Sequence, residues 1–217
     1  MIEPDLLRLF VSAFVTLFVV IDPPGCAPIF AGLTRDASHL QARGMAVRAC
    51  LIAGAILFTF ALVGEKLLAA LHIELNSFRI AGGIMLFLIA LEMVFEKRTQ
   101  RRNERVEKAR AKYEEAPQEV EDVAVFPMAM PMLAGPGSIA TVMLLMSQAQ
   151  GTPSTLVIMG ALVSVLLLSL VALIAAVPLM RLLGDQVEAV ITRLLGVLLA
   201  ALAAQYIIDG LRSAMGS

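Results

Sequence analysis

The stretch V-I-D-P-P-G-C-A-P-I-F, residues 20–30, lies inside the first long hydrophobic segment of the chain. A second stretch of the same character, P-M-L-A-G-P-G-S-I-A-T, occupies residues 131–141. Proline has no N–H and clashes with the carbonyl four residues before it, so two adjacent prolines followed by glycine end a helix rather than bend it. Asp22 directly before Pro23 has the pattern of a helix N-cap and first turn. The sequence therefore predicts two membrane spans that are each broken into half-helices.

The whole chain has the composition of a membrane protein. Of its 217 residues, 59% are hydrophobic and 16% charged, and the mean hydropathy is +0.85. Soluble domains are usually below half apolar and about a quarter charged. The apolar residues fall in runs of about 20, which cross a hydrocarbon core about 30 Å thick. We predict an all-α, polytopic membrane protein with six spans, at residues 6–33, 46–71, 78–95, 124–147, 155–182 and 190–211.

The six spans divide into two related halves. The Pro-Gly pairs at 24–25 and 136–137 are 112 positions apart, whereas Arg79 and Arg193 are 114 positions apart. The two halves would therefore differ in length by two residues between these positions. Because each half has three spans, the second enters the membrane from the opposite side. Inverted repeats of this kind recur in secondary transporters. The predicted units are a first repeat, a charged linker and a second repeat, at residues 1–95, 96–122 and 123–217.

The positions of the charges predict the orientation. Thirteen of the 17 Lys and Arg residues lie in or beside the loops at 34–45, 96–122 and 183–189. Lys and Arg near the ends of spans stay in the cytoplasm. We therefore expect a cytoplasmic linker and two extracytoplasmic termini. The linker is interpreted as a solvated helical segment, and no nucleic-acid partner is expected for so short a loop.

The half-helix ends inside the membrane are the candidate binding site. Each unsatisfied backbone N–H costs several kcal/mol in lipid, and a helix N-terminus favours anions. Two such ends, brought together by a pseudo-twofold axis, would suit a substrate carboxylate, while Asp22 or a carbonyl would meet an ammonium group. The alternative is a pair of proline kinks that serve packing alone. The predicted substrate-binding residues are Asp22, Pro23, Pro24, Gly25, Cys26, Gly135, Pro136, Gly137, Ser138 and Thr141.

A coupling or secondary site could use other polar residues of the spans. An intramembrane carboxylate is a functional hypothesis by default, so Asp22 is either a structural cap or a site for a proton or a cation such as sodium. Glu92 corresponds to Tyr206 at the offset of 114, which could place both near one site. The alternatives are an interfacial carboxylate and an ordinary boundary tyrosine. The candidates for this second site are Asp22, Glu92, Gln205 and Tyr206.

No cofactor or metal is expected. His39 and His72 have no companions that would complete a metal site. Cys26 and Cys50 both lie in apolar sequence, which indicates membrane-embedded thiols rather than a disulfide framework.

The two broken stretches resemble the signatures of the MarC family of bacterial inner-membrane proteins. Residues 20–30 are similar to the family's I-D-P-x-G-x-x-P signature, which ends in I or L and then F. Residues 131–141 are similar to its P-L-L-A-G-P-G segment. The likeness extends over nearly the whole chain. It implies six spans, a location in the bacterial inner membrane and transport of neutral amino acids. The linker is a region where the family varies, so its details are not implied.

Three classes of function are compatible with these features. Alternating-access transport is favoured, although a passive channel would share the repeat and the breaks. An intramembrane aspartyl protease could use Asp22 and Asp209, but it requires two facing carboxylates that share a proton. Asp209 lies at the extracytoplasmic end of the last span, and the sequence contains neither a Gly-x-Gly-Asp nor a Gly-x-Ser-Gly motif. We therefore do not expect an enzyme.

Overall fold

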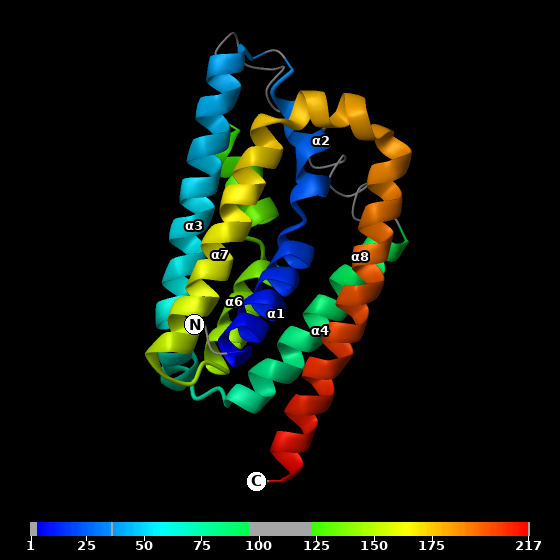
Figure 1. Cartoon of the computed structure of the whole chain (residues 1–217). Coiled ribbons are helices and arrows are strands. Elements are labelled where there is room, and N and C mark those ends of the chain that lie inside the picture. Colours follow the sequence, from blue (N-terminus) through cyan, green and yellow to red (C-terminus); the bar gives the residue numbers. More distant parts are fainter. Residues whose placement is uncertain (1–3, 36, 96–122, 217) are drawn as a thin grey trace.

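The computed structural model describes residues 4–35, 37–95 and 123–216, and they form eight helical segments. Joined at the two breaks, these segments make six spans that alternate in direction (Figure 1), as the sequence predicted. The segments are α1 (Pro4–Ile21), α2 (Pro23–Leu33), α3 (His39–Ala70), α4 (Leu75–Val94), η1 (Ala124–Leu133), α6 (Pro136–Ser147), α7 (Gly151–Ile174) and α8 (Ala176–Met215).

The molecule has two chemically different ends. The chain begins and finishes at one end, called here the terminus end (Figure 1). At the other end, called here the linker end, α2 stops, α3 starts, α4 stops and η1 starts. The charged linker at 96–122 joins α4 to η1 and lies outside the described residues.

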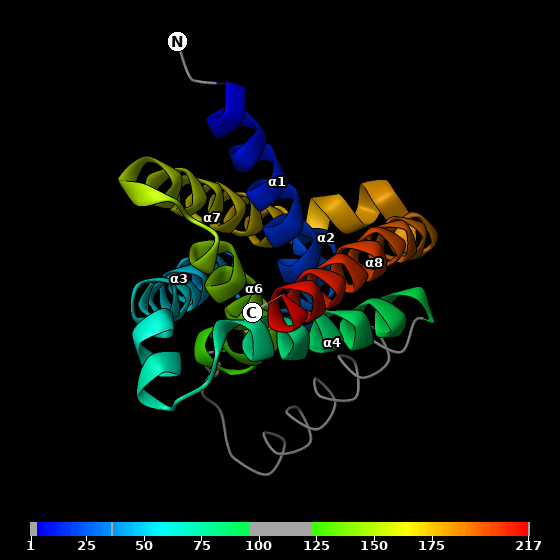
Figure 2. The same ribbon diagram turned by 90° about the horizontal axis from the view of Figure 1, so that it is seen from below.

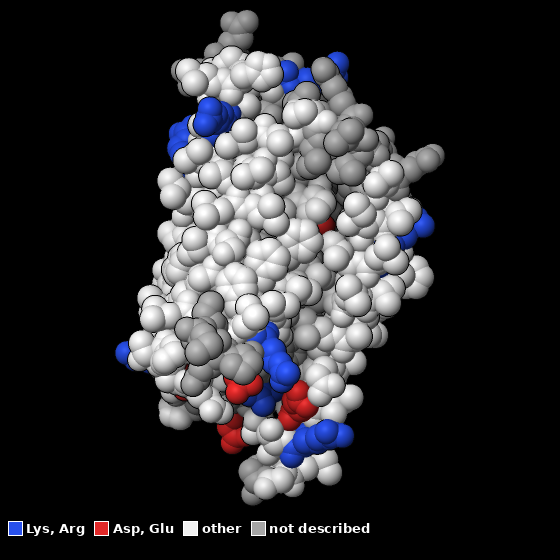
Figure 3. Space-filling model, viewed as in Figure 1, with Lys and Arg blue, Asp and Glu red and all other residues white. Residues whose placement is uncertain are grey.

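The outer faces of the helices are apolar. Large hydrophobic side chains are exposed along several spans, among them Leu51 at 66%, Leu167 at 57% and Leu194 at 63%. Figure 3 shows a broad uncharged band, with most of the Lys, Arg, Asp and Glu side chains gathered toward the two ends of that face. Soluble monomers rarely expose apolar surface on this scale. The band is the surface that faces lipid.

The helices pair as an inverted repeat predicts. The third span packs most extensively against the sixth, as α4 against α8. The first span, α1 with α2, packs on α7, and the fourth span, η1 with α6, packs on α3. These two contacts exchange when the first three spans are swapped with the last three. The α4–α8 pair maps onto itself under the same exchange.

One register of 113 residues relates the contacts of the two halves. A Cβ placed on Gly83 would lie 2.9 Å from the Ala203 carbonyl oxygen, and one on Gly196 would lie 3.1 Å from the Ala90 carbonyl oxygen. Gly196 lies 113 positions after Gly83, and Ala203 lies 113 positions after Ala90. The half-helices α2 and α6 begin at Pro23 and Pro136, which are also 113 apart.

This register corrects the two sequence offsets of 112 and 114. The sequence comparison aligned the Pro-Gly dipeptides, but the fold aligns the first proline of each half-helix, because the first helical position needs no N–H. The offset of 114 between Arg79 and Arg193 also pairs Gly196 with Gly82, whereas the contact with the opposite helix is made by Gly83. The predicted change of length by two residues is therefore not required.

The boundary between the last two spans was predicted wrongly. The fifth span ends at Ile174 rather than 182, and the expected loop at 183–189 is part of α8, a helix of 40 residues. Pro178 cannot continue α7, but it fits the first turn of a new helix, where its missing N–H would have no partner anyway. Figure 1 shows the first part of α8 crossing the linker end before the helix descends beside α4.

Candidate functional site

The first break is a single residue, Asp22, between α1 and α2. Its backbone is left-handed, with φ 57° and ψ 63°, and its side chain is fully buried. Aspartate and asparagine tolerate this conformation better than most residues. The Asp22 carboxylate accepts a hydrogen bond from the Gly25 N–H at 3.2 Å. Asp22 is therefore the N-cap that the sequence predicted.

The start of α2 leaves no backbone donor free. Pro23 and Pro24 have no N–H, the Gly25 N–H is bound by the cap, and the Cys26 N–H donates to the Asp22 carbonyl at 3.1 Å. The Cys26 thiol donates to the Ile21 carbonyl at 3.5 Å, which gives the last carbonyl of α1 a partner. The expectation of free N–H groups at both half-helix ends is therefore not met at this one.

The start of α6 is different. Gly135 is its N-cap and has no side chain to cap the helix, and Pro136 is its first residue. The first intrahelical bond runs from Ile139 N–H to the Gly135 carbonyl at 3.0 Å. In the parts of the chain that the structure describes, the N–H groups of Gly137 and Ser138 have no acceptor. Both residues are buried, so two backbone donors remain available inside the protein.

Thr141 adds a third unsatisfied group about one turn further along α6. Its residue is 0% exposed, and its hydroxyl oxygen has no hydrogen-bond partner. Among the described residues, the only other buried side-chain nitrogen or oxygen in this condition is Nε of Arg79. A buried polar group without a partner costs about 1–3 kcal/mol. A ligand or a water with hydrogen-bonding groups at this place would offset that cost.

The two breaks lie next to each other in the interior. A Cβ added at Gly137 would collide with the Ile89 side chain and lie 3.6 Å from Cγ1 of Val20, two residues before Asp22. Figure 2, viewed along the bundle, shows α2 and α6 near its centre with the longer spans around them. The helix N-terminus of α6, which carries about half a positive charge, therefore lies beside the end of α1 that Asp22 follows.

Comparison with known proteins identifies the family. The profile of the MarC family integral membrane proteins matches residues 7–215. The chain belongs to the MarC family. It is 34% identical over 209 residues to a UPF0056 membrane protein of Methanocaldococcus jannaschii, covering 96% of this chain and 98% of the relative. It is 36% identical over 209 residues to a UPF0056 membrane protein of Aquifex aeolicus (94% and 93%), and 34% identical over 206 residues to the UPF0056 inner membrane protein YhgN of Escherichia coli (93% and 95%). No solved structure matches the chain.

The MarC chain does not bring the residues of the predicted second site together. Glu92 is partly buried on α4 beside the contact of Met93 with Gly196. Tyr206 is 6% exposed and lies beside Ile207, which contacts Gly83. Gly83 and Glu92 are nine residues apart on α4, which corresponds to about 14 Å along the helix axis. At the register of 113 the partner of Tyr206 is Met93, so the correspondence with Glu92 is lost.

Gln205 also lies away from the breaks. Its side chain is exposed and donates a hydrogen bond of 2.8 Å to Asp209, one turn further along α8. Cys26 and Cys50 are buried and carry no disulfide. No group of three or more His, Cys, Asp and Glu residues suited to a metal ion occurs in the described ranges.

The sequence reading missed how irregular the first half of the fourth span is. The segment η1 is wound as a π-type helix, and Phe126 and Met130 have extended backbone angles within it. Each of them precedes a proline, and a residue in that position is driven away from the helical region. Pro127 and Pro131 were the sequence features from which this irregular backbone could have been predicted. The axis also bends by 51° between η1 and α6, whereas α1 and α2 together pass as one span.

Proposed function

We propose that this MarC protein is a secondary transporter of small neutral amino acids that works by alternating access. The observation that supports the proposal is the set of three buried, unpartnered donors at the start of α6: two N–H groups and the Thr141 hydroxyl. A carboxylate accepts several such bonds, and the helix dipole adds to its stabilisation. The inverted repeat, with broken spans at matching positions, supports transport as the class of function.

A zwitterion fits this site better than an anion does. Asp22 is buried beside the same break, so a bound anion would bring a second acidic group close to its carboxylate. The ammonium group of an amino acid would offset that repulsion, and a zwitterion would enter the interior with no net charge, which avoids a large desolvation cost. The neighbours of Gly137 are the apolar side chains of Val20 and Ile89, which favours a substrate with a small, uncharged side chain.

The proposal assigns the two half-helix ends different roles. The N–H groups of α2 are already occupied, so the substrate carboxylate is assigned to α6 alone. Asp22 is assigned a double role, as the cap of α2 and as the partner of the ammonium group. A proton or a sodium ion would be the coupling ion, because an ion gradient can drive a substrate without net charge only if the ion is transported together with it.

An aspartyl protease is not favoured. Asp209 is bonded to Gln205 on α8, whereas Asp22 is fully buried between α1 and α2. The two carboxylates that would share a proton in such an enzyme are therefore held in different surroundings.

The test is counterflow in proteoliposomes. The purified full chain is reconstituted with unlabelled alanine, serine, threonine or glycine inside, and uptake of the labelled amino acid is followed. We expect saturable uptake that is accelerated by internal substrate. Uptake that grows linearly with concentration and ignores internal substrate would indicate a channel, and no uptake of any of the four would refute the proposed substrate class.

A further inference from the structure

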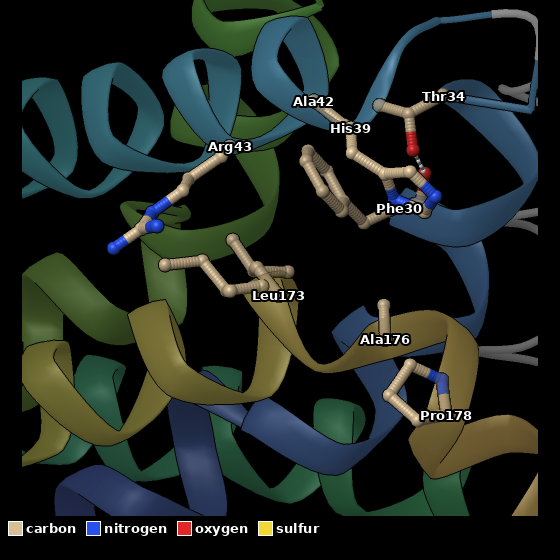
Figure 4. Close-up of a pocket in the computed structure, with 9 residues that line it drawn as sticks. Phe30, Thr34, His39, Ala42, Arg43, Leu173, Ala176 and Pro178 are labelled. Carbon is tan, nitrogen blue, oxygen red and sulfur yellow. Dashed lines mark hydrogen bonds between the residues drawn. The ribbon is translucent and has the colours of Figure 1, made fainter.

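A cavity of about 420 Å³ opens at the linker end of the molecule. Phe30 of α2 and Thr34, the residue that caps the end of α2, form its buried floor, at 2% and 7% exposure. The exposed residues His39 and Arg43 of α3 lie at its rim, so the cavity reaches the surface. On the opposite wall it is bounded by the end of α7 and the start of α8 (Figure 4), through Leu173, Ile174, Ala176 and Pro178.

The corresponding place at the terminus end is filled. At the register of 113, Phe30 corresponds to Met143, and Thr34 corresponds to Ser147 at the end of α6. Position 177 lies between the cavity residues Ala176 and Pro178, and it corresponds to Gly64 of α3. A Cβ placed on Gly64 would lie 2.7 Å from Cγ, 2.9 Å from Cε and 3.2 Å from Sδ of Met143. Met143, only 7% exposed, therefore lies flat against the backbone of α3.

The two ends of this pseudo-symmetric molecule therefore differ at the level of Phe30 and Met143. The wall of α2 and the wall of α7 and α8 enclose a cavity at the linker end. The equivalent walls, α6 and α3, are in contact at the terminus end. Packed interfaces are bistable rather than continuously deformable, so the open arrangement at one end and the packed arrangement at the other are two states that each end of the repeat could adopt.

We infer that this structure is closed at the terminus end, where Met143 packs against Gly64 as the gate, and open at the linker end as far as Phe30, the matching gate residue that separates the cavity from the first break. This inference rests on the proposed transport function. In the opposite state Phe30 would pack on the start of α8, and Met143 would leave Gly64.

The gate residues lie on the path to the breaks. Residues four apart share a face of a helix, so Phe30 stands one turn from Cys26 and two turns from Asp22 on α2. Met143 stands one turn from Ile139 and two turns from Gly135 on α6 in the same way. Withdrawal of Phe30 would extend the cavity down α2 toward the first break. Withdrawal of Met143 would open an equivalent route from the other end.

A disulfide tests the gate at the terminus end. The Cγ position of Met143 lies 2.7 Å from a Cβ at Gly64, so the two Cβ atoms of a Gly64→Cys/Met143→Cys variant are less than about 4.2 Å apart, within the disulfide range of about 3.5–4.5 Å. In reconstituted full-length protein we expect an oxidant to form this disulfide, to lower amino-acid counterflow more than tenfold, and a reductant to restore it. The wild-type chain, whose Cys26 and Cys50 are buried, is the oxidant control.

Labelling provides a readout that needs no transport. A membrane-impermeant maleimide applied at the linker end should modify Phe30→Cys at least tenfold faster than the same reagent at the terminus end modifies its counterpart Met143→Cys. The inference is overturned if the oxidised double variant transports as fast as the reduced one, or if the two single variants react at equal rates. Absence of counterflow in both the wild type and the reduced variant would refute the transport proposal instead, and the labelling rates would still decide which end is open.

Discussion

Asp22 meets two demands at one position. The residue between two half-helices must accept a left-handed backbone, and the start of α2 needs an acceptor for the Gly25 N–H. Aspartate supplies both and adds a carboxyl group. Asparagine also caps helices well and tolerates φ > 0, so it separates the structural role from any role of the carboxyl group.

We expect Asp22→Asn to retain the melting temperature of the wild type within a few degrees and to lose more than tenfold in counterflow. Asp22→Ala should instead lower the free energy of unfolding by about 2–3 kcal/mol, because it loses the cap and places alanine in a left-handed conformation. Thermal unfolding in detergent and counterflow in liposomes measure the two effects. Wild-type counterflow with unchanged pH dependence in the Asn variant would reduce Asp22 to a cap.

The Thr141 hydroxyl permits a test in which stability and binding move in different directions. Thr141→Val keeps the shape and removes a buried, unpartnered hydroxyl, so the free energy of unfolding should stay constant or rise by up to about 1 kcal/mol. Substrate affinity should fall about 2–10-fold, the value of one hydrogen bond.

The control for that substitution is Ser169→Ala in α7. The buried Ser169 hydroxyl donates to the Val165 carbonyl at 2.8 Å, so its loss should leave substrate affinity unchanged. Equal loss of affinity in both variants, or a destabilised Thr141→Val with full affinity, would contradict a binding role for Thr141.

At the scale of the helices, Gly83 and Gly196 are two points of close approach between α4 and α8. An alanine at either position would meet a backbone carbonyl of the opposite helix, which cannot move aside as a flexible side chain can. We expect Gly83→Ala and Gly196→Ala to destabilise by similar amounts, about 1–3 kcal/mol each. Gly160→Ala in α7, where nothing lies within 4 Å of the added Cβ, should be neutral or stabilising by up to about 1 kcal/mol. Strongly unequal effects of the first two would argue against the twofold relation.

Gly137 packs against a neighbouring span as well as starting α6. The added methyl of Gly137→Ala would collide with Cδ1 of Ile89, and Ile89→Val removes that atom. We expect Gly137→Ala to lower both stability and counterflow, and the addition of Ile89→Val to restore the melting temperature but not the counterflow. Recovery of both together would mean that Gly137 acts only through packing.

The sequence predicted which spans break, but not how each break is satisfied. Proline and glycine act locally, so the interruptions at Asp22 and Gly135 could be read directly. Whether an N–H is free depends on its acceptor, and at α2 the prolines and the Asp22 side chain removed every donor. The end of α7 was missed because hydropathy continues past Ile174 and only Pro178 indicates the stop. The register of 113 depends on which of two adjacent glycines, Gly82 or Gly83, meets α8, and only the packing decides that.

At the scale of the whole molecule, the orientation in the membrane is still a prediction. The excess of Lys and Arg places the linker end in the cytoplasm. Arg35 and Met215 are exposed at opposite ends of the described chain, which makes them suitable sites for cysteine labelling. In intact cells a membrane-impermeant thiol reagent should label Met215→Cys, and should label Arg35→Cys only after permeabilisation. The reverse pattern would invert the assignment of the two ends.

The pairing of α4 with α8 also constrains how the chain can be synthesised. When α4 leaves the ribosome, the helix that covers its glycine face is still about a hundred residues from being made, which corresponds to roughly 5–20 s of translation. During that interval Gly83 must face lipid or the insertion machinery. The first half therefore cannot reach its final packing alone, and assembly waits for the last helix of the chain. A truncation that removes α8 would leave that face of α4 without the partner it has in the complete fold.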